Sequence, residues 1–347
     1  MKFLSDKALE RLRAAPDADA PDLEGTRYRL LERVARGGMG VVYAAEDANL
    51  KRRVALKVLD SRAGDAEMAS RLVREAHVLA RLEHPGIVPV HDVGTLADGR
   101  VFYTMKFVEG QRLDEFIAGV PSRPDRLRLF LRICDAVAFA HAQGVLHRDL
   151  KPANVMVGPF GEVLVMDWGL AKILRGGTLA EAREANSEET IIERAKPATR
   201  EDEATDVSMI TGHGTVMGTP GYMSPEQARG DVERLDARSD IYSLGALLRF
   251  LLTESEKSPF NPNEKKIDKS LEAICAKATA SDPANRYASV LELALDISRY
   301  LDGLAVGARQ ETAFEKMGRF YRRYRFFILL ILAYLAMRVL ILLFLHR

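Results

Sequence analysis

One short polar segment says more about this chain than any other. Residues 147–154 read His-Arg-Asp-Leu-Lys-Pro-Ala-Asn, and Asp167-Trp168-Gly169 follows after a short apolar stretch. The segment holds a carboxylate that could accept a proton, Asp149, with a cation, Lys151, two residues away. Asn154 and Asp167 add the oxygen atoms that a hard cation such as Mg²⁺ prefers. An ordinary surface loop rarely combines these groups, so we interpret the segment as catalytic.

The order of these residues resembles the catalytic loop and the metal-binding turn of protein kinases, H-R-D-L-K-x-x-N and D-x-G. The resemblance implies that Asp149 accepts the proton of a substrate hydroxyl while the γ-phosphoryl group of ATP is transferred in line. It implies that Lys151 neutralises the moving charge, and that Asn154 and Asp167 bind Mg²⁺, for which Mn²⁺ could substitute. Trp168 replaces the usual phenylalanine of the turn as a larger apolar plug.

Two motifs nearer the N-terminus extend the resemblance to the ATP site. Residues 35–42 read A-R-G-G-M-G-V-V and resemble the kinase glycine-rich loop, with alanine in the first glycine position. Gly37 and Gly40 would let backbone amides approach the phosphates, because they lack a β-carbon. Residues 54–57 match the V-A-I-K strand, so Lys57 would hold the α- and β-phosphates. Glu75, in a helix predicted over 65–82, would pair with Lys57 in the active state.

The same resemblance predicts an adenine pocket. Strands are predicted over 84–90 and 102–105, joined by a turn at Asp98-Gly99. The second strand would end at a gatekeeper, Met105, and 106–108 would be the hinge. The complete set of predicted ATP-binding residues is Val34, Gly37, Gly40, Val42, Ala55, Lys57, Met105, Phe107, Val108 and Met156.

A long polar segment follows the metal-binding turn. Residues 218–226 resemble the P+1 loop and A-P-E motif, with Ser224 for alanine, so the activation segment would span 167–226. Our hypothesis is that Thr215, with Thr211 beside it, is phosphorylated there and that Arg148 grips the phosphate. The alternative for Thr215 is an ordinary loop threonine.

Three later residues complete the resemblance. Asp240 matches the aspartate at the start of a long kinase helix that braces the catalytic loop. Arg286 matches the late arginine that pairs with the A-P-E glutamate, here Glu226. That pair would be structural, and loss of one partner would leave a buried charge.

The fold class implied is α+β, the two-lobed protein kinase fold over residues 28–304. The N-lobe (28–108) would be rich in β-strands and the C-lobe (109–304) helical, with ATP and Mg²⁺ between them. Residues 1–27 mix charge, alanine and proline and are interpreted as a tether. They lack the apolar run of a signal peptide. Cys134 and Cys275 lie far apart in apolar surroundings, which favours buried thiols in a reducing compartment.

The C-terminal end predicts a single transmembrane helix at 326–345, after a basic linker at 305–325. Fifteen of its residues are Leu, Ile, Phe or Val, and together they favour insertion by about 6 kcal/mol against a cost of about 3 kcal/mol for Arg338. The basic flank would place the kinase domain in the cytoplasm, at the inner membrane of a bacterium. The alternatives are a helix that packs on the kinase or on itself. The segment could also join two copies into a homodimer, but it lacks a clean small-xxx-small motif.

The function that these features predict is an ATP- and Mg²⁺-dependent Ser/Thr protein kinase in bacterial signalling, which phosphorylates itself and other proteins. The formal net charge of +1 gives no overall attraction to nucleic acid. One alternative is a pseudokinase, a nucleotide-binding scaffold without turnover, favoured by Ala35 and Trp168. Another is transfer to small molecules, against which the P+1 motif argues.

Overall fold

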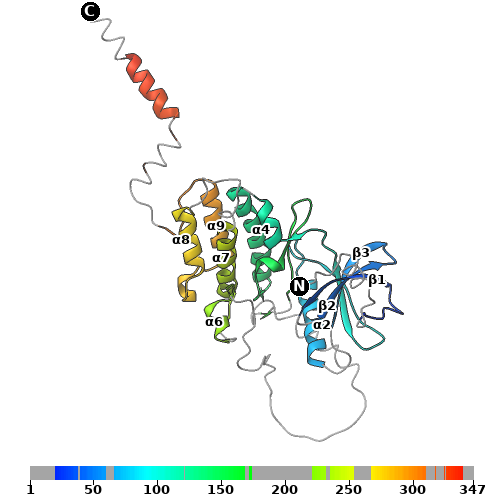
Figure 1. Cartoon of the computed structure of the whole chain (residues 1–347). Coiled ribbons are helices and arrows are strands. Elements are labelled where there is room, and N and C mark those ends of the chain that lie inside the picture. The colour runs from blue at the N-terminus through cyan, green and yellow to red at the C-terminus, as the bar shows by residue number, and fades with distance from the viewer. Residues whose placement is uncertain are drawn as a thin grey trace, which may run out of the picture.

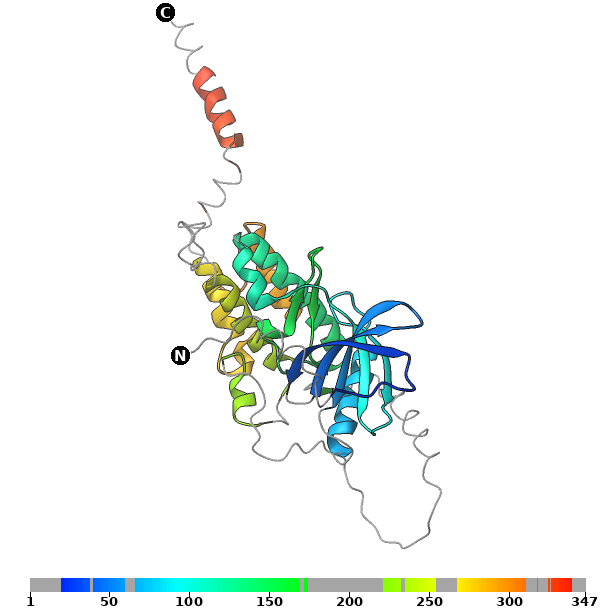
Figure 2. The ribbon, with the colours of Figure 1, turned by 45° about the vertical axis from the view of Figure 1, so that its right-hand side comes forward.

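The computed structural model describes residues 20–37, 40–59, 66–120, 122–168, 172–173, 221–231, 235–253, 267–309, 317, 324 and 326–338. They form two lobes (Figure 1). One lobe contains the large sheet and α2, and the other contains α4, α7, α8 and α9; the turned view in Figure 2 keeps the two groups apart. The bilobal α+β fold predicted from the sequence is confirmed.

The N-lobe is a five-stranded antiparallel sheet in the order β1-β2-β3-β5-β4. Side chains alternate between its two faces. One face buries an apolar cluster of its own, around Tyr43, Leu56 and Phe102, and the other receives α2. The elements are β1 (Tyr28–Gly37), β2 (Gly40–Asp47), β3 (Arg52–Leu59), α2 (Ala66–Ala80), β4 (Val90–Thr95) and β5 (Val101–Lys106).

The strand predicted over 84–90 is wrong, because β4 begins only at Val90. Pro85 and Pro89 lack the backbone N–H that a strand ladder needs, so the segment runs as a loop in which Ile87 forms an isolated bridge to Val165. The turn at Asp98-Gly99 is confirmed. Gly99 has a φ of 83°, a left-handed conformation that glycine adopts without strain.

The C-lobe is built around α4, whose apolar face is fully buried against α7 and α9. This helix begins at Arg123 because Ser122 caps it and accepts a hydrogen bond from the Asp125 amide. The helices are α3 (Leu113–Phe116), α4 (Arg123–Ala142), α6 (Pro225–Ala228), α7 (Ala237–Thr253), α8 (Lys269–Ala278) and α9 (Val290–Leu301).

Short strands place the polar segment 147–154 at the junction of the lobes. It starts directly after β7 and ends in a 3₁₀ turn that leads into β8, and β9 then delivers the chain to Asp167. The strands form two small sheets, β6-β8-β9 and β7-β10. Their bounds are β6 (Gln111–Arg112), β7 (Val145–Leu146), β8 (Val155–Val157), β9 (Val163–Val165) and β10 (Lys172–Ile173).

Beyond the lobes, residues 326–338 form a helix whose side chains are almost all exposed, drawn in red at the C-terminal end of Figure 1. In the described parts of the chain, no helix has both the length and the apolar character needed to cross a membrane. Residues 339–345 of the predicted span lie outside the described residues. Cys134 and Cys275 are free and buried, as predicted.

Candidate active site

Lys57 and Glu75 form a buried ion pair between β3 and α2. The Lys57 ammonium lies 2.8 Å from Glu75 Oε1 and 3.0 Å from Oε2, and Asp167 Oδ1 is 3.6 Å away. Burial alone would lower the pKa of Lys57, but the two carboxylates outweigh it, so this pKa lies above its ordinary value. The predicted contact between Lys57 and Glu75 is present, and it gives a fixed positive charge at the junction of the lobes.

Asp149, Lys151 and Asn154 converge in the segment 147–154. Asp149 Oδ2 accepts hydrogen bonds from Lys151 Nζ at 2.7 Å and from Asn154 Nδ2 at 3.1 Å. Asn154 Nδ2 also donates to the Asp149 carbonyl at 2.8 Å, which closes the loop on itself. A carboxylate held in this way has a defined orientation and can accept a proton from a hydroxyl placed beside it.

The residues predicted to bind a metal ion suit Mg²⁺ chemically. The side-chain nitrogen of Asn154 donates its hydrogen bonds to Asp149. The side-chain oxygen of Asn154 is therefore the atom that could coordinate a metal ion. The side chain of Asp167 is 53% exposed and its backbone has a φ of 57°, a left-handed conformation. Mg²⁺ takes only one or two protein oxygens and completes its shell with water and phosphate. One amide and one carboxylate oxygen therefore fit such an ion.

Three of the predicted adenine-binding residues, Val42, Ala55 and Met105, share one face of the large sheet. Val42 pairs with Lys57 in the ladder, and Ala55 pairs with Met105; paired residues in an antiparallel sheet share a face, as do residues two apart in a strand. Val34 lies at an irregularity of the β1–β2 ladder and is 53% exposed. Phe107, Val108 and Met156 are half-buried. The structure thus brings Val42, Ala55 and Met105 to the side of the sheet that carries Lys57.

Gly37 and Gly40 differ in the space that the structure leaves for a side chain. A β-carbon at Gly40 would collide with the backbone carbonyl of Val58 on the neighbouring strand, so the sheet itself excludes a side chain there. At Gly37 the nearest atom to such a carbon is 3.9 Å away. Close packing of β2 on β3 explains Gly40 without a ligand, whereas the described contacts leave room for a methyl group at Gly37.

Asp240, at the start of α7, holds the backbone of the polar segment through hydrogen bonds. Its carboxylate accepts hydrogen bonds from the backbone amides of His147 and Arg148 at 2.9 and 2.8 Å, and His141 Nε2 lies 2.8 Å from it. Burial would raise the pKa of Asp240, but these partners lower it overall. The contact predicted for Asp240 is present. His141 supports this contact.

Glu226 and Arg286 form a two-armed ion pair beside the start of α7. Arg286 Nη1 and Nη2 donate to the two carboxylate oxygens at 2.7 and 2.8 Å, and Ser239 donates a third bond at 2.9 Å. Burial opposes ionisation, yet Arg286 and Ser239 lower the pKa of Glu226 to about 2. The predicted pair joins α6 to the turn that precedes α9.

Trp168 is buried beside the polar segment. Its ring lies 4.6 Å from that of His147, and the indole N–H donates to the Val165 carbonyl at 3.3 Å. This environment matches the predicted apolar plug. It also adds a hydrogen bond that phenylalanine could not make.

Two contacts in the site were not predicted from the sequence. Gln227 donates from Nε2 to the Arg148 carbonyl at 2.7 Å, which links α6 to the polar segment. The hydroxyl of Tyr103 donates to Glu75 Oε1 at 2.8 Å. A tyrosine inside an apolar strand is a signal in itself, because a buried phenol needs a partner. Its partner was hidden by the distance of 28 residues between them.

The predicted phosphorylation sites, Thr211 and Thr215, lie outside the described residues, as does most of the segment from 169 to 220. Arg148 is described. Its backbone has a φ of 71° and is held at both ends by Asp240 and Gln227. Burial, which Asp240 only partly offsets, lowers the pKa of Arg148.

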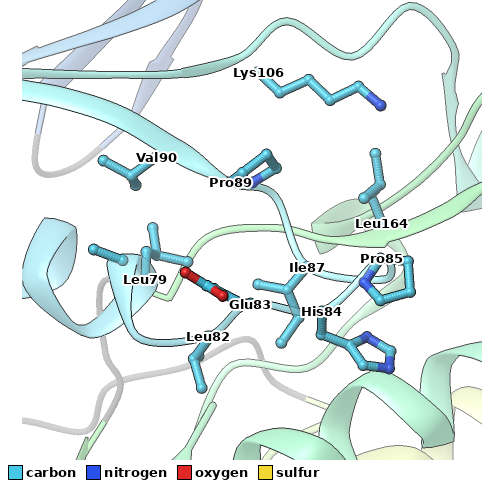
Figure 3. Close-up of a pocket in the computed structure, with 11 residues that line it drawn as sticks. Leu79, Leu82, Glu83, His84, Pro85, Ile87, Pro89, Val90, Lys106 and Leu164 are labelled. Atoms are coloured by element: carbon cyan, nitrogen blue, oxygen red, sulfur yellow. The ribbon is translucent and has the colours of Figure 1, made fainter.

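A cavity of 640 Å³ lies apart from these groups, between the end of α2, the 81–89 connection and β9 (Figure 3). Leu79, Leu82 and Ile87 supply apolar walls, and Glu83 and Lys106 supply one charge of each sign. Lys106, the first residue of the predicted hinge, lines it, but none of the ten residues predicted as the ATP-binding set does.

The protein kinase domain family matches residues 28–300. The chain belongs to the protein kinase family. Its relatives include the Ser/Thr-protein kinase PknD of Protochlamydia amoebophila, which is 34% identical over 313 residues, and PknD of Chlamydia trachomatis, which is 36% identical over 313 residues. Both alignments cover 80% of this kinase chain, but only 30% and 32% of those proteins. The chain thus spans about a third of the length of these curated relatives.

Solved structures agree with this membership. The crystal structure of the Mycobacterium tuberculosis PknI kinase domain has a TM-score of 0.52 and 25% sequence identity to this kinase. The structural alignment covers 79% of this chain and 95% of the PknI kinase domain. A double mutant of the same domain gives a TM-score of 0.54 at 25% identity. Both curated relatives and the solved neighbours are bacterial proteins, as the resemblance in the sequence implied.

Proposed function

We propose that this chain is a Ser/Thr protein kinase that transfers the γ-phosphoryl group of ATP to protein hydroxyls, including its own. The observation that carries the proposal is the presence of two ordered polar groups at the lobe junction. One is the Lys57–Glu75 pair, with Asp167 3.6 Å from Lys57. The other is the cluster of Lys151 and Asn154 on Asp149. The naming of its relatives as Ser/Thr-protein kinases supports the choice of substrate class.

The two groups divide the work of phosphoryl transfer. Lys57, kept cationic and aimed by Glu75, binds the α- and β-phosphates and orients the nucleotide. Asp149 receives the proton of the attacking hydroxyl, and Lys151, 2.7 Å from the same carboxylate, stabilises the charge that develops on the transferred group. Asn154 and Asp167 would hold Mg²⁺, which when bound neutralises charge on the phosphate oxygens.

Regulation through the activation segment is part of the proposal. We place the activating phosphate on Thr215, or on Thr211 beside it, with Arg148 as its partner. Arg148 supports this by its place directly before Asp149, with its backbone amide bound to Asp240, because a guanidinium can bind a phosphate through two hydrogen bonds at once. The carbonyl of Arg148 accepts a hydrogen bond from Gln227. A phosphothreonine bound by the Arg148 guanidinium would therefore act on a catalytic segment that is already connected to α6.

We also propose that residues 326–345 anchor the kinase in the inner membrane as a single span, with the catalytic domain in the cytoplasm. The described part, 326–338, is helical, and its large apolar side chains are exposed. The basic residues of the linker supply the orientation. Two anchored copies could associate through this helix, without a contact between their kinase domains.

The test of kinase activity is a phosphosite map of the chain after incubation with Mg²⁺ and ATP, beside Asp149→Asn. This substitution keeps the size of the side chain and both hydrogen-bond partners within reach, but it removes the base. We expect incorporation to fall by a factor on the order of 10²–10⁴, with thermal stability unchanged and with phosphate on Thr215 or Thr211 only in the unsubstituted chain.

Equal incorporation in both chains would contradict the role of Asp149. ATP binding without any incorporation, in the presence of an added protein substrate such as myelin basic protein, would favour the pseudokinase instead. A map with abundant phosphate that omits Thr211 and Thr215 would leave the kinase activity standing and refute the proposed switch.

A further inference from the structure

Tyr103 lies directly opposite Lys57 in the antiparallel ladder of β3 and β5. Directly paired residues share a face of the sheet, with β-carbons about 4.5–5.5 Å apart. Both side chains therefore rise from the sheet toward α2, the helix that carries Glu75. The Lys57 ammonium lies 5.6 Å from the centre of the Tyr103 ring, within the range of a cation–π contact.

The hydroxyl of Tyr103 makes the third contact of this group. It donates to Glu75 Oε1 at 2.8 Å, the same oxygen that lies 2.8 Å from Lys57 Nζ. Glu75 is thus held by two donors from two strands, one charged and one neutral. Lys57 alone could follow the carboxylate through several orientations, because its stem is flexible. The rigid phenol ring allows far fewer, so it defines where the carboxylate sits.

The group is closed to solvent. Tyr103 is 2% exposed and Glu75 is 4% exposed. If the hydrogen bond between them were lost, water could not easily replace either partner, so the loss would be costly. Burial and the adjacent Glu75 raise the pKa of Tyr103 well above its ordinary value. The phenol therefore keeps its proton, and remains a donor, at every pH at which the protein would be assayed.

We propose that Tyr103 is a positioning residue for the Lys57–Glu75 pair: its hydroxyl fixes the Glu75 carboxylate, and through it α2, in the orientation that presents Lys57 to the nucleotide. This inference rests on the kinase activity proposed above. It means that the position of α2 depends on a residue of β5 as well as on the Lys57–Glu75 pair.

The test compares Tyr103→Phe with Tyr28→Phe in the full chain. Tyr28 is a matched control, because it is also a buried tyrosine of the same sheet whose hydroxyl donates to a carboxylate, that of Asp92 at 2.9 Å. It lies on the opposite face, beside Thr104 and away from Lys57. Each substitution removes one oxygen atom and the hydrogen bond that it donates to a carboxylate. Tyr28→Phe also removes the contacts of that oxygen with Arg27 and Thr104, so it is the stricter control for the general loss of a buried hydroxyl.

Phosphorylation of myelin basic protein is measured at varied ATP. We expect kcat/KM for ATP to fall about tenfold in Tyr103→Phe, the effect of losing one hydrogen bond to a charged group, with KM for the protein substrate unchanged. In Tyr28→Phe we expect kcat/KM for ATP within about twofold of the unsubstituted kinase, a difference too small to count as a lost contact. Both variants should show a decrease in melting temperature, and the decrease should be no smaller in Tyr28→Phe, which loses more hydrogen bonds.

A double-mutant cycle separates positioning from general packing. In the Glu75→Ala background the phenol has no carboxylate to hold, so adding Tyr103→Phe should change kcat/KM by no more than about twofold. A further tenfold fall in that background would show that Tyr103 acts through packing, and it would overturn the inference. So would full activity of the single Tyr103→Phe variant.

Hydrogen exchange in α2 gives a readout that does not depend on turnover. Amides of Ala66–Ala80 should exchange faster in Tyr103→Phe and be unchanged in Tyr28→Phe. If the unsubstituted chain proved inactive, the proposed function would fail, but this measurement would still decide whether Tyr103 holds α2. Unchanged exchange of α2 in Tyr103→Phe would refute the positioning role in an active or an inactive chain.

Discussion

At the scale of single residues, Gly37 and Gly40 show that one motif can combine two unrelated requirements. Both belong to the glycine-rich loop in the sequence, where they were expected to admit the phosphates. In the structure Gly40 has a reason that needs no ligand, because Val58 on the neighbouring strand leaves no space for a β-carbon. Among the described residues, Gly37 has no such neighbour. The two positions can therefore be separated by experiment.

We expect Gly37→Ala to fold with a melting temperature close to that of the unsubstituted chain and to raise KM for ATP severalfold. We expect Gly40→Ala to lower the free energy of unfolding by about 1–3 kcal/mol, the usual cost of overpacking. Thermal unfolding and ATP kinetics on both variants check this. A Gly37→Ala variant with unchanged KM would show that the phosphates do not approach that position.

At the scale of elements, α6 is tied into the C-lobe by electrostatics. Helix α6 has only four residues, too few to hold a position by its own hydrogen bonds. The capping box of Ser224 and Gln227 closes its first turn, and Glu226 binds Arg286 with two hydrogen bonds. The helix therefore depends on these contacts to present the end of the activation segment to the polar segment.

The Glu226–Arg286 pair predicts a pH dependence. The pKa of Glu226 falls from 4.5 to about 2 on folding, so the folded state favours the ionised carboxylate. The resulting stabilisation, about 3 kcal/mol, is fully present above pH 4.5 and is lost as the pH falls toward 2. We expect the difference in unfolding free energy between the unsubstituted chain and Glu226→Gln to be largest near pH 7 and to shrink below pH 4.5.

Urea unfolding at pH 7, 5, 4 and 3 measures that difference. Taking the difference between the two chains removes the titration of other groups, provided that they are distant from Glu226. A difference that stays constant between pH 7 and pH 3 would mean that Glu226 is not ionised preferentially in the folded state.

At the scale of the whole molecule, the two lobes meet where Asp167 of the C-lobe approaches Lys57 of the N-lobe, 3.6 Å apart. Each lobe orders its own part of the site. The N-lobe aims Lys57 with Glu75, and the C-lobe aims Asp149 with Lys151 and Asn154. Catalysis as proposed needs both parts in register, so anything that shifts α2 changes the site without altering the C-lobe.

The proposed membrane anchor makes a prediction at the same scale. Residues 326–345 favour insertion by a net of about 3 kcal/mol, and two arginines near the centre would cost about 7 kcal/mol. We therefore expect the full chain to stay in membranes during carbonate extraction, and the Ile331→Arg, Leu335→Arg double variant to be released. Arg338→Leu is the control and should remain bound. Release of the unsubstituted chain by carbonate would contradict the anchor.

The amino-acid sequence alone was enough to indicate the family, the order of most elements and the residues proposed for the site. It could do so because phosphoryl transfer demands particular side chains at short spacings, as in 147–154, and because strands and helices leave local patterns, as in β3 and α4. Those properties belong to neighbouring residues. Errors arose where local patterns mislead, as in the loop 84–90, where apolar residues cover the core without joining a strand ladder.

Which distant groups meet depends on how the elements pack in three dimensions. Nothing near Tyr103 in the chain shows that it reaches Glu75, 28 residues earlier, or that His141 supports Asp240, 99 residues later. The same holds for the carbonyl of Val58 that forbids a side chain at Gly40. These contacts depend on how α2 packs on the sheet, how α4 crosses α7 and how closely β2 lies on β3. Packing of whole elements settles such distances, and no short stretch of sequence encodes them.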